Sequence, residues 1–208
     1  MRTAIQIVLT ISIVVLTFLL YDGIMKPIRF NREKDKRYEK TIERLKAIRT
    51  AEVAFKVENG HYTASFDSLI SFIKNGNFRV VKKYGMLSDS LLQAGWTEKE
   101  ALKKGIIRRD TVLVPILDSL FGKNYPIDSI RYVPYTNGIE FKLKTNTVET
   151  GKVKVNVFEA SVENDILLNG LDPQLIINLN DERKKMTGFP GLRVGSVEEA
   201  NNNAGNWE

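Results

Sequence analysis

Few residues in this sequence have the side chains that catalysis or metal binding usually requires. The 208-residue chain contains no cysteine and a single histidine, His61. The lack of cysteine excludes thiolate nucleophiles, disulfides and cysteine-based zinc or iron–sulfur sites. A Ser-His-Asp triad or a multi-histidine metal site would have to be built around His61 alone. Because His61 stands between Gly60 and Tyr62 at an expected helix end, a surface or capping role is favoured. The sequence therefore predicts no catalytic residue.

Oxygen-bearing side chains gather in one later stretch of the sequence. Calcium prefers carboxylate and amide oxygens, but the spacing here is not that of an EF-hand loop. Turn formation by Asn and Asp is therefore favoured over a metal site, with calcium binding as an open alternative. The residues of this group are Asn164, Asp165, Asn169, Asp172, Asn178, Asn180 and Asp181.

Phosphate-binding loops are also missing from the sequence. The pairs Gly122-Lys123 and Gly151-Lys152 lack the earlier spaced glycine and the hydroxyl residue after the lysine that such a loop needs. We therefore expect no cofactor, no metal and no enzymatic activity.

Positive charge is concentrated in one segment. The formal net charge is +6, and residues 24–50 alone contain ten Lys or Arg against four Asp or Glu. The rest of the chain is therefore neutral overall, which removes the main argument for a nucleic-acid partner. The basic segment instead needs an explanation of its own.

An apolar segment precedes this basic segment. Residues 4–21 contain no charged side chain, and as a helix they are long enough to cross the hydrocarbon core of a membrane. A cleaved signal peptide is the alternative, but no small-x-small cleavage site follows. The sequence predicts a transmembrane helix over 4–21, after a short flank at 1–3, and we expect it to remain attached.

Residues 22–59 are predicted to form a basic juxtamembrane segment, broken at Gly23 and Pro27 and helical from 31 to 59. Its apolar positions recur every three or four residues and need a cover, which is either the protein's own sheet or another subunit. The expected interaction residues of this apolar stripe are Tyr38, Ile42, Leu45, Ile48 and Phe55. Its cations suit either a solvated face or contact with anionic lipid headgroups. The candidate headgroup residues are Lys26, Arg29, Arg32, Lys34, Lys36 and Arg37.

Residues 60–187 are predicted to form one α+β domain. Asn59-Gly60 ends the long helix, Ser65 or Asp67 begins a short one, and residues 88–104 are helical with a break at Gly95. A hairpin is expected around Thr136-Asn137-Gly138, and a second turn at Gly151. The expected strands are 78–81, 106–113, 129–133, 139–145, 153–162 and 175–179. Residues 188–208 are expected to form a Gly- and Asn-rich tail.

The stretch from Ala47 to Tyr62, followed by Phe66 and Leu69, resembles type IV pilins and the pseudopilins of type II secretion. The resemblance is close over residues 40–73 and architectural elsewhere. It implies a long N-terminal helix packed on an antiparallel sheet. The Gly-Phe prepilin cleavage site and the glutamate at the fifth position of the mature helix are absent, and Gln6 is the nearest polar residue.

These observations lead to one expected function and one alternative. We expect a non-enzymatic single-pass protein of the inner membrane, acting as a pilin-like structural subunit or adaptor of a transenvelope assembly through self-association or other envelope proteins. The alternative is a membrane-anchored periplasmic module that binds a ligand or an envelope polymer. The positive-inside rule favours a cytoplasmic C-terminal part, whereas the pilin resemblance implies a periplasmic one. We expect the periplasmic side, because the match at residues 47–62 is specific.

Overall fold

The computed structural model describes residues 2–93 and 95–208 of the chain. It is an α+β structure with a long N-terminal helix and two antiparallel sheets. The chain divides into two compact units, the first comprising Met1–Ala64 and Ser129–Glu208 and the second Ser65–Asp128. The second unit is thus an insertion into the first, and each is described separately below.

The first unit is built on the helix α1 (Arg2–Asn59), which is continuous over 58 residues. The predicted break at Gly23 and Pro27 is therefore wrong. Pro27 lacks only the backbone N–H that would bond to the Gly23 carbonyl, and long helix-forming segments on either side outweigh the loss of one bond. As predicted, α1 ends at Gly60, which has a φ of +79° and donates its N–H to the Lys56 carbonyl at 2.8 Å.

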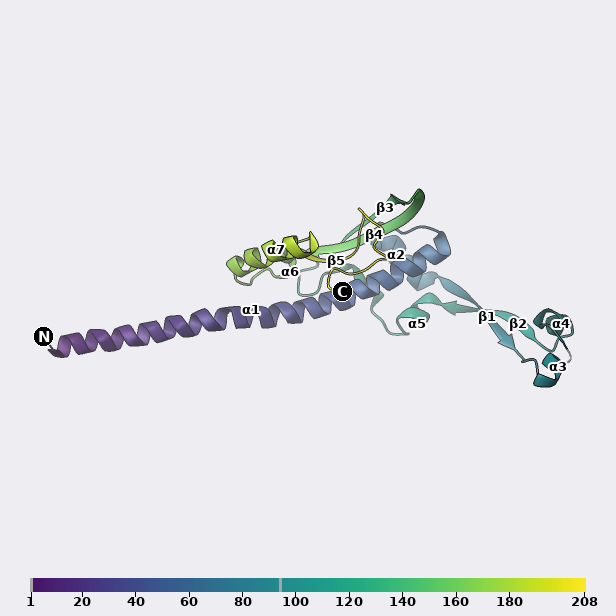
Figure 1. Ribbon diagram of the computed structural model, residues 1–208, viewed down its shortest axis with the longest axis horizontal. Coiled ribbons are helices and arrows are strands. Elements are labelled where there is room, and N and C mark those ends of the chain that lie inside the picture. The colour runs from purple at the N-terminus through teal and green to yellow at the C-terminus, as the bar shows by residue number, and fades with distance from the viewer. Residues whose placement is uncertain (1, 94) are drawn as a thin grey trace. The chain divides into compact units, whose positions relative to one another are not determined.

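A three-stranded antiparallel sheet packs on the C-terminal half of α1 (Figure 1). The strands are β3 (Lys142–Thr150), β4 (Val153–Glu163) and β5 (Gly191–Gly195), in the order β3-β4-β5. The strand β5 lies inside the expected 188–208 tail, which is a correction to the sequence analysis. A Cβ at Gly191 would lie 2.1 Å from the Val162 carbonyl oxygen, so the close approach of β5 to β4 requires glycine there.

Two other strand predictions in this unit are wrong. Residues 175–179 belong to the helix α7 (Pro173–Thr187), because Asp172 caps its first turn and Pro173 suits its first position. Residues 129–133 overlap the 3₁₀ helix η1 (Ile127–Arg131) instead of a strand. The hairpin expected around Gly138 is therefore reduced to a turn between two residues that form an isolated antiparallel bridge, Tyr132 and Glu140. The main hairpin is β3–β4, which turns at Gly151.

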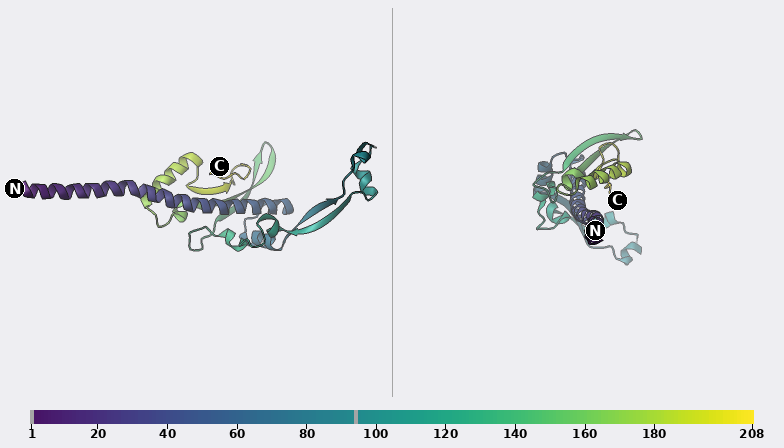
Figure 2. Two further views of the ribbon diagram at one scale, coloured as in Figure 1. Left: turned by 90° about the horizontal axis from the view of Figure 1, so that it is seen from below. Right: turned by 90° about the vertical axis from the view of Figure 1, so that its left-hand side faces the viewer.

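Between β4 and α7 lies the short helix α6 (Asn164–Leu167). In the two perpendicular views, α6 and α7 lie beside α1 on the side of the sheet nearest the N-terminal half of α1 (Figure 1, Figure 2). We call residues 168–173, which comprise the chain between these helices and the first residue of α7, the α6–α7 corner.

The second unit contains four helices and a two-stranded antiparallel ribbon. The helices are α2 (Phe66–Asn75), α3 (Asp89–Gln93), α4 (Glu98–Lys103) and α5 (Ile116–Leu120), and the strands are β1 (Asn77–Tyr84) and β2 (Arg108–Pro115). The expected helical insertion is confirmed as α3 and α4, and α4 begins with the predicted capping box of Thr97 and Glu100.

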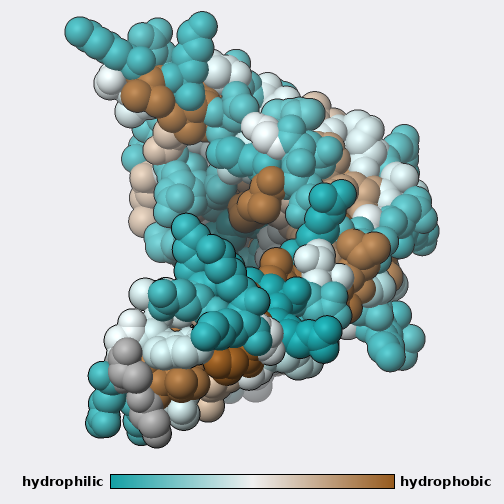
Figure 3. All heavy atoms as spheres, turned by 90° about the vertical axis from the view of Figure 1, so that its right-hand side faces the viewer, coloured by the Kyte–Doolittle hydropathy of each residue, from teal (hydrophilic) through white to brown (hydrophobic). Residues whose placement is uncertain are grey.

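Hydrophilic side chains cover most of the face of the molecule shown in Figure 3, where hydrophobic side chains lie in separate groups.

The core of the first unit forms between α1 and the sheet. Leu45 and Ile48 of α1 are fully buried, as are Phe158 of β4 and Leu192 and Val194 of β5. The register pairs Leu192 with Val162 and Val194 with Ala160, so alternate residues of both strands face the helix. Burial of these apolar side chains fixes the sheet on the C-terminal half of α1.

Candidate membrane-proximal interaction site

The N-terminal half of α1 exposes a long apolar surface. From Ile5 to Tyr21 its large apolar side chains are half or more exposed, and Ile24 and Ile28 continue this surface at 62% and 46% exposure. Among the described residues, α1 is the one helix long and apolar enough to cross a membrane. An apolar surface of this length is costly in water, so a membrane or another protein is its natural cover.

The basic residues that follow this surface differ in how they are engaged. Lys26 pairs with Asp22 at 2.8 Å, and this partner raises the Lys26 pKa above its usual value. Lys34 lies 3.3 Å from a carboxylate oxygen of Asp35. Arg29 and Arg32 are exposed, and neither has a hydrogen bond or ion pair among the described residues. Lys36 is exposed as well, but its Nζ lies 5.6 Å from the Tyr135 ring centroid. Arg29 and Arg32 are thus the two candidate headgroup residues whose side chains have no partner in the part of the chain that the structure describes.

Arg37 has a structural role that the sequence analysis did not foresee. Its guanidinium group pairs with Glu33 at 3.1 Å and donates hydrogen bonds to the backbone carbonyls of Leu167 at 3.0 Å and Asn169 at 3.1 Å. Leu167 is the last residue of α6 and Asn169 lies just after it, where the carbonyls at a helix end lack partners within the helix. Arg37 therefore fastens the α6–α7 corner to α1, and its charge is directed inward.

Tyr38 fastens the same region through a chain of hydrogen bonds. Its hydroxyl donates to Asn164 Oδ1 at 2.6 Å, Asn164 Nδ2 donates to Asn180 Oδ1 at 2.9 Å, and Asn180 Nδ2 donates to Asp165 Oδ1 at 2.9 Å. Asn164 is fully buried, and burial raises the pKa of Tyr38 to about 12. The tyrosine therefore stays protonated and keeps donating at any ordinary pH.

The apolar stripe of α1 is covered mainly from within the chain. Leu45 and Ile48 are fully buried, whereas Tyr38, Ile42 and Phe55 are partly buried. Two covers for the stripe were possible from the sequence, the protein's own sheet or another subunit. At the centre of the stripe the cover is the protein's own sheet. Leu45 and Ile48 are consequently not at the surface and are not available to another subunit.

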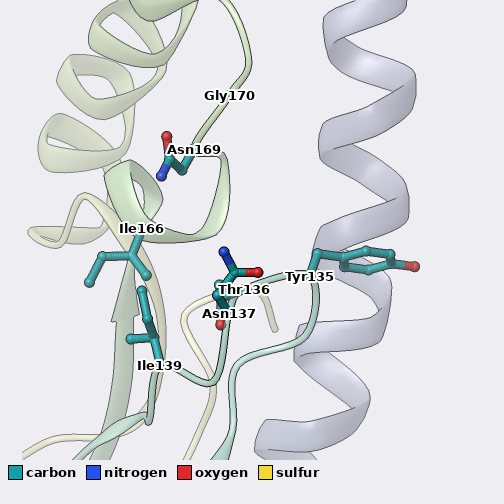
Figure 4. A pocket seen from close by; sticks show the side chains of 7 residues that line it. All are labelled: Tyr135, Thr136, Asn137, Ile139, Ile166, Asn169 and Gly170. Atoms are coloured by element: carbon teal, nitrogen blue, oxygen red, sulfur yellow. The ribbon is translucent and has the colours of Figure 1, made fainter.

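A small open pocket of about 280 Å³ lies between α6 and the turn that follows Val133. Its lining includes Thr136, Asn137, Ile139 and Asn169, and Figure 4 shows Asn137 and Asn169 facing each other across it. Tyr135 contributes backbone, because its ring points away over α1, where Lys36 Nζ lies 5.6 Å from the ring centroid. Amide and hydroxyl groups can hydrogen-bond a neutral polar ligand, but the pocket itself has no charged lining residue.

The structure reveals a buried carboxylate, Glu52, that the sequence analysis missed. Glu52 lies in α1 and is fully buried; its Oε2 accepts the Thr63 N–H at 3.1 Å, and its Oε1 has no hydrogen-bond partner. Burial raises its pKa from 4.5 to about 8, and the bond from Thr63 opposes this only in part. The position of Glu52 between Ala51 and Val53 could have suggested burial, because it falls near the apolar stripe.

The remaining candidates have local structural roles. His61 is exposed at the end of α1, with its Nδ1 2.9 Å from the Asn59 carbonyl oxygen and its ring on the edge of Phe55. In the Asn/Asp group, Asn164, Asp165 and Asn180 bond to one another, and Asp172 caps α7. Across residues 2–93 and 95–208, no three His, Asp or Glu side chains gather closely enough to hold a metal ion.

Taken together, the geometry describes an exposed apolar helix whose base is clamped to a folded α+β unit by Arg37 and Tyr38. Such a site can hold a protein at a membrane and set the orientation of the folded unit attached to it. Comparison with known proteins finds no matching family model, no matching curated protein and no matching solved structure.

Proposed function

We propose that this protein is a non-enzymatic, single-pass protein of the inner membrane that serves as a pilin-like structural subunit or adaptor in a transenvelope assembly. The observation that carries the proposal is the division of α1 into two halves. The first half is apolar and exposed, and the second half is packed on an antiparallel sheet. This arrangement is consistent with the pilin resemblance of residues 40–73, which rests on separate sequence features.

Self-association would then use the exposed half of α1. Lipid is as apolar as the leucine and isoleucine side chains of this half, so apolarity alone does not drive helices together in a membrane. Contact between helices must instead come from close packing, and from apolar residues just outside the hydrocarbon core, such as Ile28, for which burial is favourable.

Cysteine crosslinking in membranes tests this association. Single cysteines placed in turn from Ile5 to Ile28 in the full chain should give disulfide-linked dimers on oxidation. Dimers should recur every three or four positions, because one face of a helix meets its partner. Native cysteine is absent, so each crosslink is assigned without ambiguity. Glu149→Cys, on the exposed strand β3, is the control for random collision. Equal yields at all positions and at Glu149 would contradict self-association.

A second function, a membrane-anchored binding module, is favoured by the pocket near Asn137 and Asn169. Its amide groups suit a neutral polar ligand such as a saccharide of the envelope. A module of this kind would remain monomeric in the crosslinking experiment and would retain saccharide in equilibrium dialysis, with Asn169→Ala losing that retention.

The periplasmic orientation gives a separate expected result. Lys123 is exposed, so Lys123→Cys in intact cells should react with a reagent that passes the outer membrane but not the inner one. Arg2→Cys, on the other side of the proposed span, should react only after the inner membrane is lysed. The reverse pattern would place the folded units in the cytoplasm, as the positive-inside rule favours.

A further inference from the structure

The α6–α7 corner lies close to the level at which α1 would leave the bilayer. About 20 helical residues, rising about 1.5 Å each, cross a hydrocarbon core of about 30 Å. Counted from Ile5, such a span ends near Ile24, where the exposed apolar surface narrows. The headgroup layer then extends roughly 5–7 Å farther along the helix. It therefore covers the turn of α1 that contains Lys26 and Ile28.

This same turn of α1 is the one beside the corner. The charge of Asp172, the N-cap of α7, adds to the rise in the Lys26 pKa, after the larger effect of Asp22. Phe30, one turn farther on, is 8% exposed, although its neighbours Arg29 and Asn31 are exposed. Figure 1 and Figure 2 both place the N-terminal end of α7 alongside this part of α1.

Two features of the corner suit contact with lipid: exposed apolar side chains, and hydrogen bonds that fix its backbone to α1. A shallow groove of about 410 Å³ at the corner has apolar side chains along part of its wall and the polar side chains of Asp165 and Asn169 along another part. Its apolar lining residues are Leu171, Pro173, Ile176 and Ile177. The bonds from Arg37 to the Leu167 and Asn169 carbonyls hold the corner on α1. Arg29 and Arg32 are exposed on α1 roughly one and two turns beyond Lys26, and their long side chains can extend back toward the headgroups.

We propose that the α6–α7 corner, residues 168–173, together with Arg29 and Arg32 forms a second contact with the membrane, resting on anionic lipid headgroups. This inference depends on the membrane span proposed above. A helix alone can tilt and rotate in the bilayer, whereas a second contact beside it restricts both motions. The contact would thus fix the direction in which the first unit projects from the membrane.

Headgroup-depth quenching tests the contact in the full chain. Single cysteines carrying an environment-sensitive fluorophore are placed at Gln174, in the first turn of α7, and at Lys184, in its last turn. Both positions are exposed and lie on one helix, so Lys184 is the matched control. The protein is reconstituted in phosphatidylcholine vesicles containing phosphatidylglycerol and a lipid with a nitroxide on its headgroup. Val14→Cys, read with a nitroxide on the acyl chain, reports the span itself.

Quenching at Gln174 should exceed that at Lys184 by at least threefold. The double variant Arg29→Gln, Arg32→Gln should reduce the quenching at Gln174 by about half, with the fluorescence of Trp207 unchanged as evidence of folding. Equal quenching at Gln174 and Lys184, with Val14 quenched, overturns the corner contact and leaves the span intact. Unchanged quenching in the arginine variant overturns the role assigned to Arg29 and Arg32. An unquenched Val14 overturns the membrane span and the corner contact together.

Discussion

The free energy of unfolding of the first unit should fall as the pH rises from about 5 to about 8, because of Glu52. Below its ordinary pKa of 4.5, the folded and unfolded chains both hold the Glu52 proton. Between 4.5 and about 8 the folded chain keeps a proton that the unfolded chain has released, so raising the pH favours unfolding. The loss is about 1.4 kcal/mol per pH unit. It ends above the folded pKa, where both states are ionised.

Single-tryptophan fluorescence can measure this effect. The chain contains two tryptophans, and Trp96→Phe leaves Trp207 as the reporter of the first unit. Urea titrations of the full chain in detergent micelles at pH 5, 6.5 and 8 give the free energy of unfolding at each pH. Glu52→Gln keeps the shape of the side chain and an oxygen for the Thr63 N–H, but has no proton to release. The variant should therefore lose this pH dependence and exceed the parent protein in stability at pH 8.

Glu58→Gln is the matched control, because Glu58 is an exposed glutamate on the same helix. It should leave the pH dependence unchanged. A pH dependence that survives in Glu52→Gln would show that other groups produce it, and that the buried Glu52 carboxylate does not.

The second large effect is expected at Leu45, which is fully buried between α1 and the sheet. Truncation to alanine removes apolar burial and leaves a cavity, which together cost about 2–5 kcal/mol. Lys46, the next residue, is exposed, and replacing an exposed charged residue with alanine changes stability by roughly 0–1 kcal/mol. Leu45→Ala should therefore lower the urea midpoint far more than Lys46→Ala, with the same Trp207 reporter. Equal midpoints would mean that the apolar stripe is not covered by the sheet in solution.

The two predictions together distinguish a helix fixed by its own unit from one that needs another subunit. If Leu45 and Glu52 both behave as buried residues, the C-terminal half of α1 is complete within one chain. The proposed assembly would then use the N-terminal half, where the crosslinking positions lie.

Local patterns in the sequence were enough to predict several elements correctly. The apolar run at 4–21, the Gly60 helix end and the capping box at Thr97 depend on residues within a few positions of one another, and the structure contains the corresponding helices. The α+β class is likewise confirmed, because alternating and three-to-four-residue periodicities distinguish strands from helices.

Errors arose where distant residues decide the local structure. The strand β5 is short and flanked by glycine, so its own residues resemble a tail, and only pairing with β4, about 30 residues earlier, makes it a strand. Residues 175–179 are apolar enough for a strand, but the Asp172 cap begins a helix there, and the bonds from α7 to α6 and from α6 to α1 hold that helix in place. For the same reason the sequence alone could not divide the chain into the two units, whose boundaries depend on contacts between residues far apart.

The features of the candidate site likewise fall into two groups, those set by residue type and order and those set by contacts between distant segments. The sequence by itself determined the exposed apolar helix and the excess of positive charge after it, since both follow from residue type and order. Only the tertiary structure decided that Arg37 binds backbone carbonyls, that Leu45 and Ile48 are covered by the sheet, and that Glu52 is buried. Burial and hydrogen bonding depend on which distant segments lie against a side chain, and these contacts form only when the chain folds.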